Sequence, residues 1–337
     1  MVTGRASWDK GLVKPLVLPP AEAKAEIARQ AEMLANRVKK TFKQLYKRFE
    51  QEQIGAFRLY DRDIPEIRVV IDWYEGHLVV GEYARTQTDA LPGWLDVLAG
   101  TVAAGLAVGP ERVHVKRRQT RPQDGGQRYA KLGQSERRFE VREGDLRFHV
   151  NLDDYLDTGL FADHRETRQL VRDEAAGRDL LNLFGYTGTF TCHAIAGGAK
   201  ATTTVDASSR YLAWAKDNLT LNNLAAPRHE LVRADVREWL AHAARGKHRW
   251  EVVVLDPPSF SDKGEGLDVQ RDHRALVEET LAVVAPGGVL YFSTNHQRFE
   301  PQLDGLRDAT ECREITEDTV PMDYRNRQVH RCWRMVR

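Results

Sequence analysis

The residues best suited to chemistry form a DPPSF stretch that begins at Asp256, directly after the apolar run Trp250–Leu255. This run has the composition of a buried strand, and two prolines end its pairing because proline lacks an amide hydrogen. Open α/β sheets place ligands at the carboxyl ends of such strands. We therefore expect a rigid loop that grips and stacks on a flat polar ring, although a stiffened loop without chemistry is the alternative. The residues assigned to catalysis are Asp256, Pro257, Pro258 and Phe260.

Two further aspartates follow neighbouring strands of the predicted sheet. Asp206 ends the run TTTVD and can accept both hydroxyl hydrogens of a ribose, while Asp235 in RADVREW can receive an adenine amino hydrogen. Either one could simply cap a helix, which is a common role for aspartate. Three strand ends carrying Asp206, Asp235 and Asp256 together favour an adenosine-bearing cofactor. NAD is the alternative, but nothing else in the chain suggests hydride transfer.

The first strand of this sheet leads into the loop of LNLFGYTGTF, where Gly185 and Gly188 permit a tight turn before a helix. Upstream lies the segment YLDTGLFADHR. Its Phe161 could cover the cofactor, and its Arg165 could pair with the cofactor carboxylate. The alternative is that this segment is only a linker whose Asp163 caps the next helix. The predicted cofactor contacts are Phe161, Arg165, Asn182, Phe184, Tyr186, Thr187, Gly188, Asp206, Ala207, Ser208, Asp235, Val236 and Asp256.

Alternating strands and helices must position these residues. From residue 151 onward, apolar runs of strand length are each followed by a segment with helical periodicity, which predicts a parallel, doubly wound α/β sheet. The last two strands, Cys312–Glu317 and Val329–Val336, come without an intervening helix and predict a terminal hairpin. We therefore assign residues 151–337 to this cofactor-binding domain.

The amino-terminal part looks like an RNA-binding addition. Residues 1–55 contain a helix with a basic face, and residues 56–150 read as a small α/β domain with a cationic loop, KRRQTRPQDGGQRYAK, at 116–131. Mobile basic segments suit a phosphate backbone, although a solvated helix face and an ordinary hairpin tip are the alternatives. The predicted RNA contacts are Lys40, Lys43, Lys47, Lys116, Arg117, Arg118, Arg121, Arg128, Lys131, Asn295, Arg325 and Arg327.

Bulk properties exclude several classes of protein. The 337 residues carry a net charge of +1, so any affinity for nucleic acid must come from local patches. The three cysteines are far apart, which argues against a disulfide framework, a zinc site or an iron–sulfur cluster. The amino terminus lacks the apolar stretch of a signal peptide, and the longest apolar run is too short to span a bilayer. We expect a soluble, cytoplasmic protein, most simply a monomer, that needs no metal and no membrane.

Several motifs resemble the RlmK part, the carboxyl-terminal half, of the bifunctional RlmKL methyltransferases of large-subunit ribosomal RNA. The matching stretches are ANRVKK, RLYDRDIPE, YLDTGLFADHR, NLFGYTGTFTCHA, TTTVDAS, DPPSFS, DVQRDH and NRQVH. The resemblance implies a class I, Rossmann-like methyltransferase domain that uses S-adenosylmethionine to modify nitrogen-7 of a guanine in bacterial 23S ribosomal RNA or its assembly precursor. Because the other half of the fused enzyme has no counterpart here, the chain is expected to be a freestanding version.

The residues discriminate among methyl acceptors. Carbon-5 methylation of a pyrimidine needs a thiolate, and the DPPSF and STNH segments where related enzymes carry it have no cysteine. Guanine nitrogen-7 needs only alignment and a nearby carboxylate, because it already has a lone pair. An exocyclic amine such as the guanine two-amino group stays open, since Asp256 could accept its hydrogen. A small-molecule methyltransferase would leave the basic additions unexplained, and an RNA-binding assembly factor without catalysis would not need the three aspartates.

Overall fold

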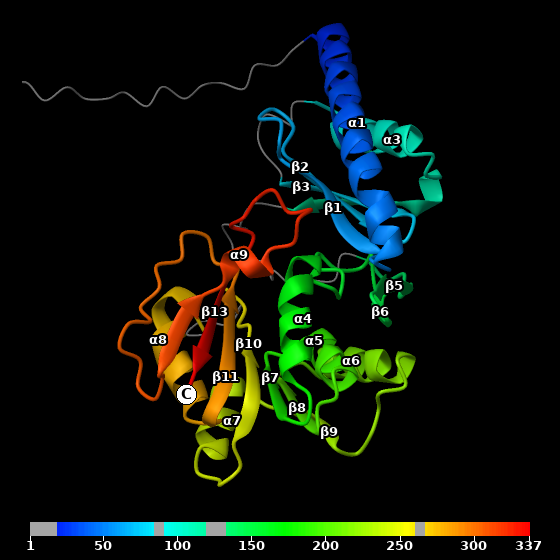
Figure 1. The fold of residues 1–337 in the computed structure, drawn as a ribbon. Helices are drawn as coiled ribbons and strands as arrows, with labels where there is room; N and C mark the ends of the chain where they lie inside the picture. Colours follow the sequence, from blue (N-terminus) through cyan, green and yellow to red (C-terminus); the bar gives the residue numbers. More distant parts are fainter. Residues whose placement is uncertain (1–18, 84–90, 119–132, 260–266) are drawn as a thin grey trace, which may run out of the picture.

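The computed structural model describes residues 19–83, 91–118, 133–259 and 267–337. Figure 1 shows a long helix and a small sheet at the amino-terminal end and a larger sheet, flanked by helices, formed by the rest of the chain. None of the helices in the described segments is long and apolar enough to cross a membrane.

Helix α1 (Pro20–Gln51) begins with a proline at its first turn, where the missing amide hydrogen is harmless. Its apolar residues recur every three or four positions, so one stripe that includes Leu34, Val38 and Phe49 is buried. This stripe packs against helix α3 (Trp94–Gly105) and strand β1 (Ala56–Asp61). The opposite face is left to polar and basic residues.

The small sheet has the order β1-β2-β3-β4, with β2 (Val69–Tyr74), β3 (His77–Tyr83) and β4 (Val113–Arg118) following β1. The first three strands pair antiparallel, whereas β4 runs parallel to β3 after the crossover through α3 and the short helix η1 (Pro110–Arg112). In the fold the Arg58 guanidinium pairs with Asp72 on β2 at 2.8 Å.

Strands β5 (Phe139–Glu143) and β6 (Leu146–Val150) form a separate antiparallel hairpin. Their inward side chains, such as Phe148, share one apolar cluster with Cys192 of α5 (Thr189–Ala196) and Leu219 of α6 (Ser209–Leu221). Tyr74 and Val79 of the small sheet belong to the same cluster. The hairpin therefore packs on both parts of the molecule.

The large sheet has the order β12-β13-β11-β10-β7-β8-β9. Strands β7 (Asp179–Leu183), β8 (Ala201–Asp206), β9 (His229–Arg233), β10 (Trp250–Leu255) and β11 (Val284–Thr294) are parallel, and β13 (Arg331–Val336) runs antiparallel between β11 and β12 (Glu311–Glu314). This confirms the doubly wound fold and the terminal hairpin. A short helix, α9 (Thr316–Thr319), nevertheless lies between the last two strands, contrary to expectation.

Both faces of this sheet are covered, which explains the unbroken apolar run of β10. Val252 and Val254 belong to a cluster with α4 (Arg165–Glu174) and α5, whereas Val253 and Leu255 belong to a cluster with α7 (Val236–Ala243) and α8 (Val269–Leu281). Successive side chains of a strand point to opposite faces, so a strand between two helix layers must be apolar throughout.

A buried arginine joins the small hairpin to the large domain. Arg168 on α4 donates two hydrogen bonds of 2.6 Å to Glu143 of β5, and both side chains are almost fully buried. Burial alone would raise the pKa of Glu143, but the adjacent guanidinium holds it well below its usual value. His193 Nε2 lies 2.9 Å from the same carboxylate, but Arg168 is the only guanidinium paired with it among the described residues, so loss of Arg168 would leave a buried charge poorly compensated.

We predict that Arg168→Leu lowers the free energy of unfolding by about 3–5 kcal/mol, because the Glu143 carboxylate then stays buried without its guanidinium partner. Urea unfolding followed by circular dichroism measures the loss. Arg237→Leu is the matched control, since the Arg237–Glu279 pair is 46% and 37% exposed and should contribute far less. Equal losses in the two variants would contradict this account of the buried pair.

Candidate active site

The loop between β7 and α5 has an unusual backbone. Phe184, Tyr186 and Gly188 all adopt positive φ angles, of 55°, 48° and 73°. The left-handed region is disfavoured for residues with a Cβ atom, and such strain tends to accumulate at functional sites. At Gly188 an added Cβ would lie 2.8 Å from the Cβ of Ala215, so only glycine fits. The turn therefore brings the amino end of α5 close against α6 and leaves the loop backbone at the edge of the sheet.

Two residues predicted to bind the cofactor form hydrogen bonds within the protein that support this loop. Asn182 is 2% exposed and donates to the Thr191 hydroxyl at 3.0 Å. Thr187 is fully buried and donates to the Gly159 carbonyl at 2.6 Å. Their polar atoms are thus used within the protein, and they shape the loop that faces the ligand.

Asp206 lies beside the loop at the end of β8. One carboxylate oxygen accepts from the Tyr186 amide at 3.0 Å and the other from the Ser208 amide at 2.8 Å. Each oxygen can accept a further hydrogen bond. Burial raises the pKa of Asp206. Ala207 is exposed, and Ser208 caps helix α6 by accepting from Tyr211.

Asp235 follows β9 and caps helix α7, which was the alternative considered for it. Its Oδ1 accepts from the amides of Arg237 at 2.9 Å and Glu238 at 3.1 Å. The residue is exposed, and its second oxygen has no hydrogen bond to the described residues. Capping and recognition of an adenine amino group are therefore compatible, while the next residue, Val236, is buried in the core.

Asp256 stands where β10 ends, and its side chain is 25% exposed. Its Oδ1 accepts from the Ser293 hydroxyl at 2.6 Å. Pro257 is buried and Pro258 half-buried, as expected for a fixed loop, whereas Phe260 lies outside the described residues. Ser259 donates to the side-chain oxygen of Asn295, so the loop is tied to the segment after β11.

The segment before α4 differs from expectation at one position. The Phe161 ring lies 5.1 Å from that of Tyr186, consistent with a cover over the loop. Arg165, however, is 6% exposed, and its guanidinium donates to Asp323 at 2.6 Å and to the Ala56 carbonyl at 3.2 Å. These buried partners use the charge, so Arg165 joins the domains in this arrangement and does not face a cofactor carboxylate.

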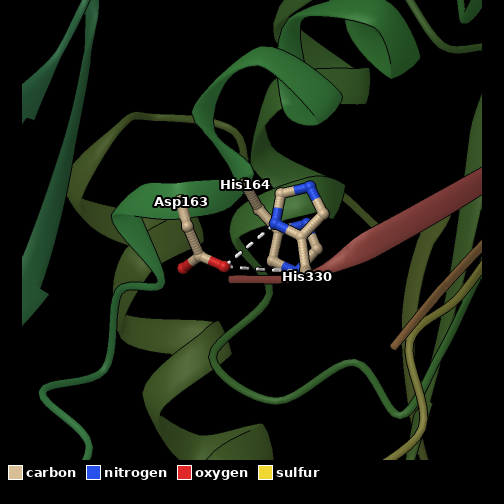
Figure 2. Close-up of side chains that lie close together, drawn as sticks. All are labelled: Asp163, His164 and His330. Atoms are coloured by element: carbon tan, nitrogen blue, oxygen red, sulfur yellow. Dashed lines mark hydrogen bonds and ion pairs between the residues drawn. The ribbon is translucent and has the colours of Figure 1, made fainter. Parts of the chain in front are cut away.

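Sequence reasoning missed a polar cluster beside Asp256, which Figure 2 shows as Asp163, His164 and His330. His164 Nε2 lies 3.8 Å from Asp256 Oδ2 and 4.0 Å from Asp163 Oδ2. His330 Nδ1 lies 3.0 Å from Asp163 Oδ2. Asp163 is therefore part of this network and not a helix cap. Both histidines stand in quoted motifs, YLDTGLFADHR and NRQVH, which was the available signal.

The cluster contains the only group of described residues that could offer three ligand atoms to a metal ion. The two imidazole rings are stacked, however, with centroids 4.3 Å apart and planes within 11° of parallel. Lone pairs of imidazole nitrogens lie in the ring planes, so stacked rings do not converge on one ion as metal ligands do. His330 also uses both nitrogens, at 3.0 Å from Asp163 and 3.0 Å from Thr319. The geometry favours a hydrogen-bonded network.

The predicted RNA contacts have mixed outcomes. Lys116 is 4% exposed and its ammonium donates to the Tyr155 carbonyl at 2.6 Å, so the structure buries it as an internal tie and corrects that expectation. Arg327 is exposed but donates to the carbonyls of Val320 and Glu317, which holds its guanidinium on its own loop. The remaining exposed positions are Lys40, Lys43, Lys47, Arg117, Asn295 and Arg325, of which Arg325 pairs with Asp63 at 3.0 Å. The Arg118 side chain and Arg121, Arg128 and Lys131 lie outside the described part of the chain.

The strand order and these strand-end carboxylates define a class I, Rossmann-like methyltransferase. A family model for S-adenosylmethionine-dependent methyltransferases matches residues 56–316, and the chain belongs to this family. A curated relative, "Ribosomal RNA large subunit methyltransferase K" of Neisseria meningitidis serogroup B (strain ATCC BAA-335 / MC58), is 42% identical over 306 residues, which are 89% of this chain and 85% of that protein.

Solved structures show the same fold. SMU.776, assigned as a methyltransferase and solved in complex with SAH, superposes with a TM-score of 0.70 at 24% identity, over 90% of this chain and 82% of that one. A SAM-dependent methyltransferase from Agrobacterium tumefaciens gives a TM-score of 0.52 at 18% identity, over 68% and 71% of the two chains. The expectations for fold class and for S-adenosylmethionine as cofactor are thus confirmed.

The residues present fit this cofactor. Asp206 keeps one acceptor position on each oxygen, as two ribose hydroxyls require, and Asp235 keeps an oxygen for the adenine amino group. Phe184 and Tyr186 adopt the left-handed conformation in the loop that leads to the amino end of α5. When bound, S-adenosylmethionine supplies an electrophilic methyl group. The residues at this edge of the sheet would hold the cofactor.

We predict that Asp206→Asn weakens S-adenosylmethionine binding by about ten- to a hundredfold, because the amide presents one acceptor oxygen instead of two charged ones. Affinity of the unchanged protein should also fall with decreasing pH, beginning above the range of an ordinary aspartate. The raised pKa of Asp206 means that its accepting, ionised form is lost earlier as the solution becomes acidic.

Isothermal titration calorimetry between about pH 5 and pH 8, above the range in which an ordinary aspartate titrates, measures both effects. Asp217→Asn is the matched control, since Asp217 is 48% exposed on α6 and pairs with Arg138. Unchanged affinity in Asp206→Asn would show that this carboxylate does not hold the ribose.

Proposed function

We propose that this chain methylates nitrogen-7 of a guanine in bacterial 23S ribosomal RNA, acting in the cytoplasm as a monomer on the RNA or its assembly precursor. The relative with 42% identity is named as a methyltransferase of large-subunit ribosomal RNA, which supports the substrate class. The observation that carries the choice of atom is Asp256, a partly exposed carboxylate at the end of β10, with rigid prolines after it.

Guanine nitrogen-7 attacks with a lone pair that it already has, so no base must remove a proton. Catalysis then requires alignment of that nitrogen with the methyl group at about 3 Å and stabilisation of the cation that forms on the ring. Asp256 supplies negative charge for this cation and can accept from a polar edge of the base. Pro257 and Pro258 keep the loop from adapting to other positions.

The cysteines disfavour a pyrimidine carbon as acceptor. Cys192 and Cys332 are fully buried, and burial raises the pKa of the Cys192 thiol to about 12. Cys312 is exposed, but it lies on the edge strand β12, four strands away from β7 in the sheet order. Carbon-5 methylation needs a thiolate that adds to the ring at the site of transfer. An exocyclic amine stays the second candidate, because the Asp256 carboxylate could also accept from an amino group.

The RNA-binding surface that we propose lies on α1. Lys40, Lys43 and Lys47 recur at helical spacing, so they form one exposed stripe. Beside this stripe the rings of Phe42 and Tyr46 stack at 4.7 Å, and Tyr46 is 39% exposed. Lysines next to an exposed aromatic ring suit an RNA strand, whose phosphates need cations and whose bases stack.

A pocket of about 210 Å³ adjoins these aromatic rings. Tyr46 and Trp73 form its apolar side, while Arg142 with Glu50 and Glu75 forms its charged side. A flat ring with polar edges could stack on the first side and hydrogen-bond to the second. We propose that a base near the target nucleotide occupies it, while the target itself is turned out of its helix, because the major groove of RNA is too deep and narrow for access to nitrogen-7.

We expect 7-methylguanosine to be the product when the purified protein acts on 23S ribosomal RNA with S-adenosylmethionine. Mass spectrometry of the nucleosides, with and without Asp256→Ala, identifies the modified atom and tests the assigned carboxylate. The variant should lose activity while its circular dichroism spectrum stays that of the unchanged protein. N2-methylguanosine or a methylated pyrimidine as product would overturn the proposed acceptor.

The charge-reversed variant Lys40→Glu/Lys43→Glu/Lys47→Glu should bind the RNA at least tenfold more weakly and show a shallower salt dependence, because fewer phosphate counterions are released. Its affinity for S-adenosylmethionine should not change. The control Lys200→Glu/Lys216→Glu/Lys247→Glu makes the same change of charge at exposed positions of the other domain. If both variants lost RNA affinity equally, net charge and not the α1 stripe would explain the binding.

A further inference from the structure

The two oxygens of the Asp256 carboxylate have different neighbours. Oδ1 accepts a hydrogen bond from Ser293, at the end of β11. Oδ2 faces His164 Nε2 at 3.8 Å. One oxygen is thus fixed by a hydroxyl, and the other faces the imidazole of His164.

The imidazole of His164 is itself held in place. The residue is 5% exposed, and its ring stacks on that of His330 with centroids 4.3 Å apart. The Phe190 ring meets it edge to face, with centroids 5.8 Å apart. His330 is in turn anchored by Asp163 at 3.0 Å, as Figure 2 shows. Its other ring nitrogen lies 3.0 Å from the Thr319 hydroxyl. Asp163 and His164 belong to the 3-10 helix η2 (Ala162–His164), His330 directly precedes β13, and Thr319 ends helix α9. Such a buried stack leaves His164 little freedom to turn.

The surroundings also define the protonation state of this ring. Burial, and then the neighbouring imidazole of His330, lower the pKa of His164, so it is neutral near pH 7. Its Nε2 faces the carboxylates of Asp163 and Asp256, while Nδ1 is buried without a hydrogen-bond partner among the described residues. Two acceptors on one side favour the tautomer with hydrogen on Nε2. His164 therefore presents a neutral donor to Asp256.

We propose that His164 is a positioning residue that directs its Nε2 hydrogen at Asp256 Oδ2 and so fixes the plane of this carboxylate for the methyl acceptor. Ser293 holds the other oxygen, and the stack on His330 keeps the imidazole in line. The separation of 3.8 Å is longer than a hydrogen bond, and we expect it to shorten when the acceptor is bound, as is common for catalytic contacts. The inference rests on the proposed function, because that function gives Asp256 its role.

The test compares single-turnover methylation of 23S ribosomal RNA by the unchanged protein, His164→Ala and His164→Gln. We expect His164→Ala to methylate about a hundredfold more slowly, because displacing a reacting group by about 1 Å can lower the rate by this factor. The KM for RNA and the Kd for S-adenosylmethionine should not change. His164→Gln keeps a donor of similar reach and should recover most of the rate. His229→Gln is the control, a buried histidine at the amino end of β9.

A double-mutant cycle separates positioning from a merely structural role. In the Asp256→Asn background His164→Ala should have little further effect, because the oriented carboxylate is already gone. Additive losses, or an unchanged rate in His164→Ala, would overturn the inference. Should His164→Ala fail to fold in thermal unfolding assays, His164→Asn replaces it, since its amide is one methylene shorter than that of Gln. Failure of the unchanged protein to form 7-methylguanosine would instead refute the proposed function.

Discussion

The register of four parallel strands is the constraint on which the site depends. Leu183 of β7 pairs with Leu255 of β10 and with Val205 of β8, so Phe184, Asp256 and Asp206 follow at one level. Asp206 is paired in turn with Arg233 of β9, two residues before Asp235. A slip of one residue in any pairing would turn a carboxylate to the other face of the sheet. The apolar residues that fill both faces thus also decide where the polar groups meet.

This constraint explains why much of the site could be predicted from the sequence. Strand ends can be recognised from the change from apolar runs to Asp, Gly and Pro, and in a parallel sheet they meet at one edge. The aspartates at 206, 235 and 256 are placed in this way. The role of Asp235 as a cap was also open to prediction, since a cap needs only local sequence.

Other features depend on contacts between distant segments and could not be predicted. His164 and His330 are stacked although 166 positions separate them in the sequence. The sequence places Lys116 in a cationic loop, but in the structure its ammonium group donates a hydrogen bond to the carbonyl of Tyr155. Arg58 lies within strand β1, where its charge is neutralised by Asp72 on the next strand. In each case the partner, and not the residue itself, determines the outcome.

Asp323 has a consequence for how the two parts of the molecule work together. Its carboxylate is fully buried, and it accepts from the Arg58 amide of β1 at 2.8 Å and from the Arg165 guanidinium at 2.6 Å. One side chain thus links the small sheet, the segment that carries His164 and the loop before β13. Hinge motion would have to break these buried bonds. The small sheet, with α1 packed against it, is therefore held at a fixed distance from the strand end that carries Asp256. In the function proposed above, an RNA substrate would have to match that distance.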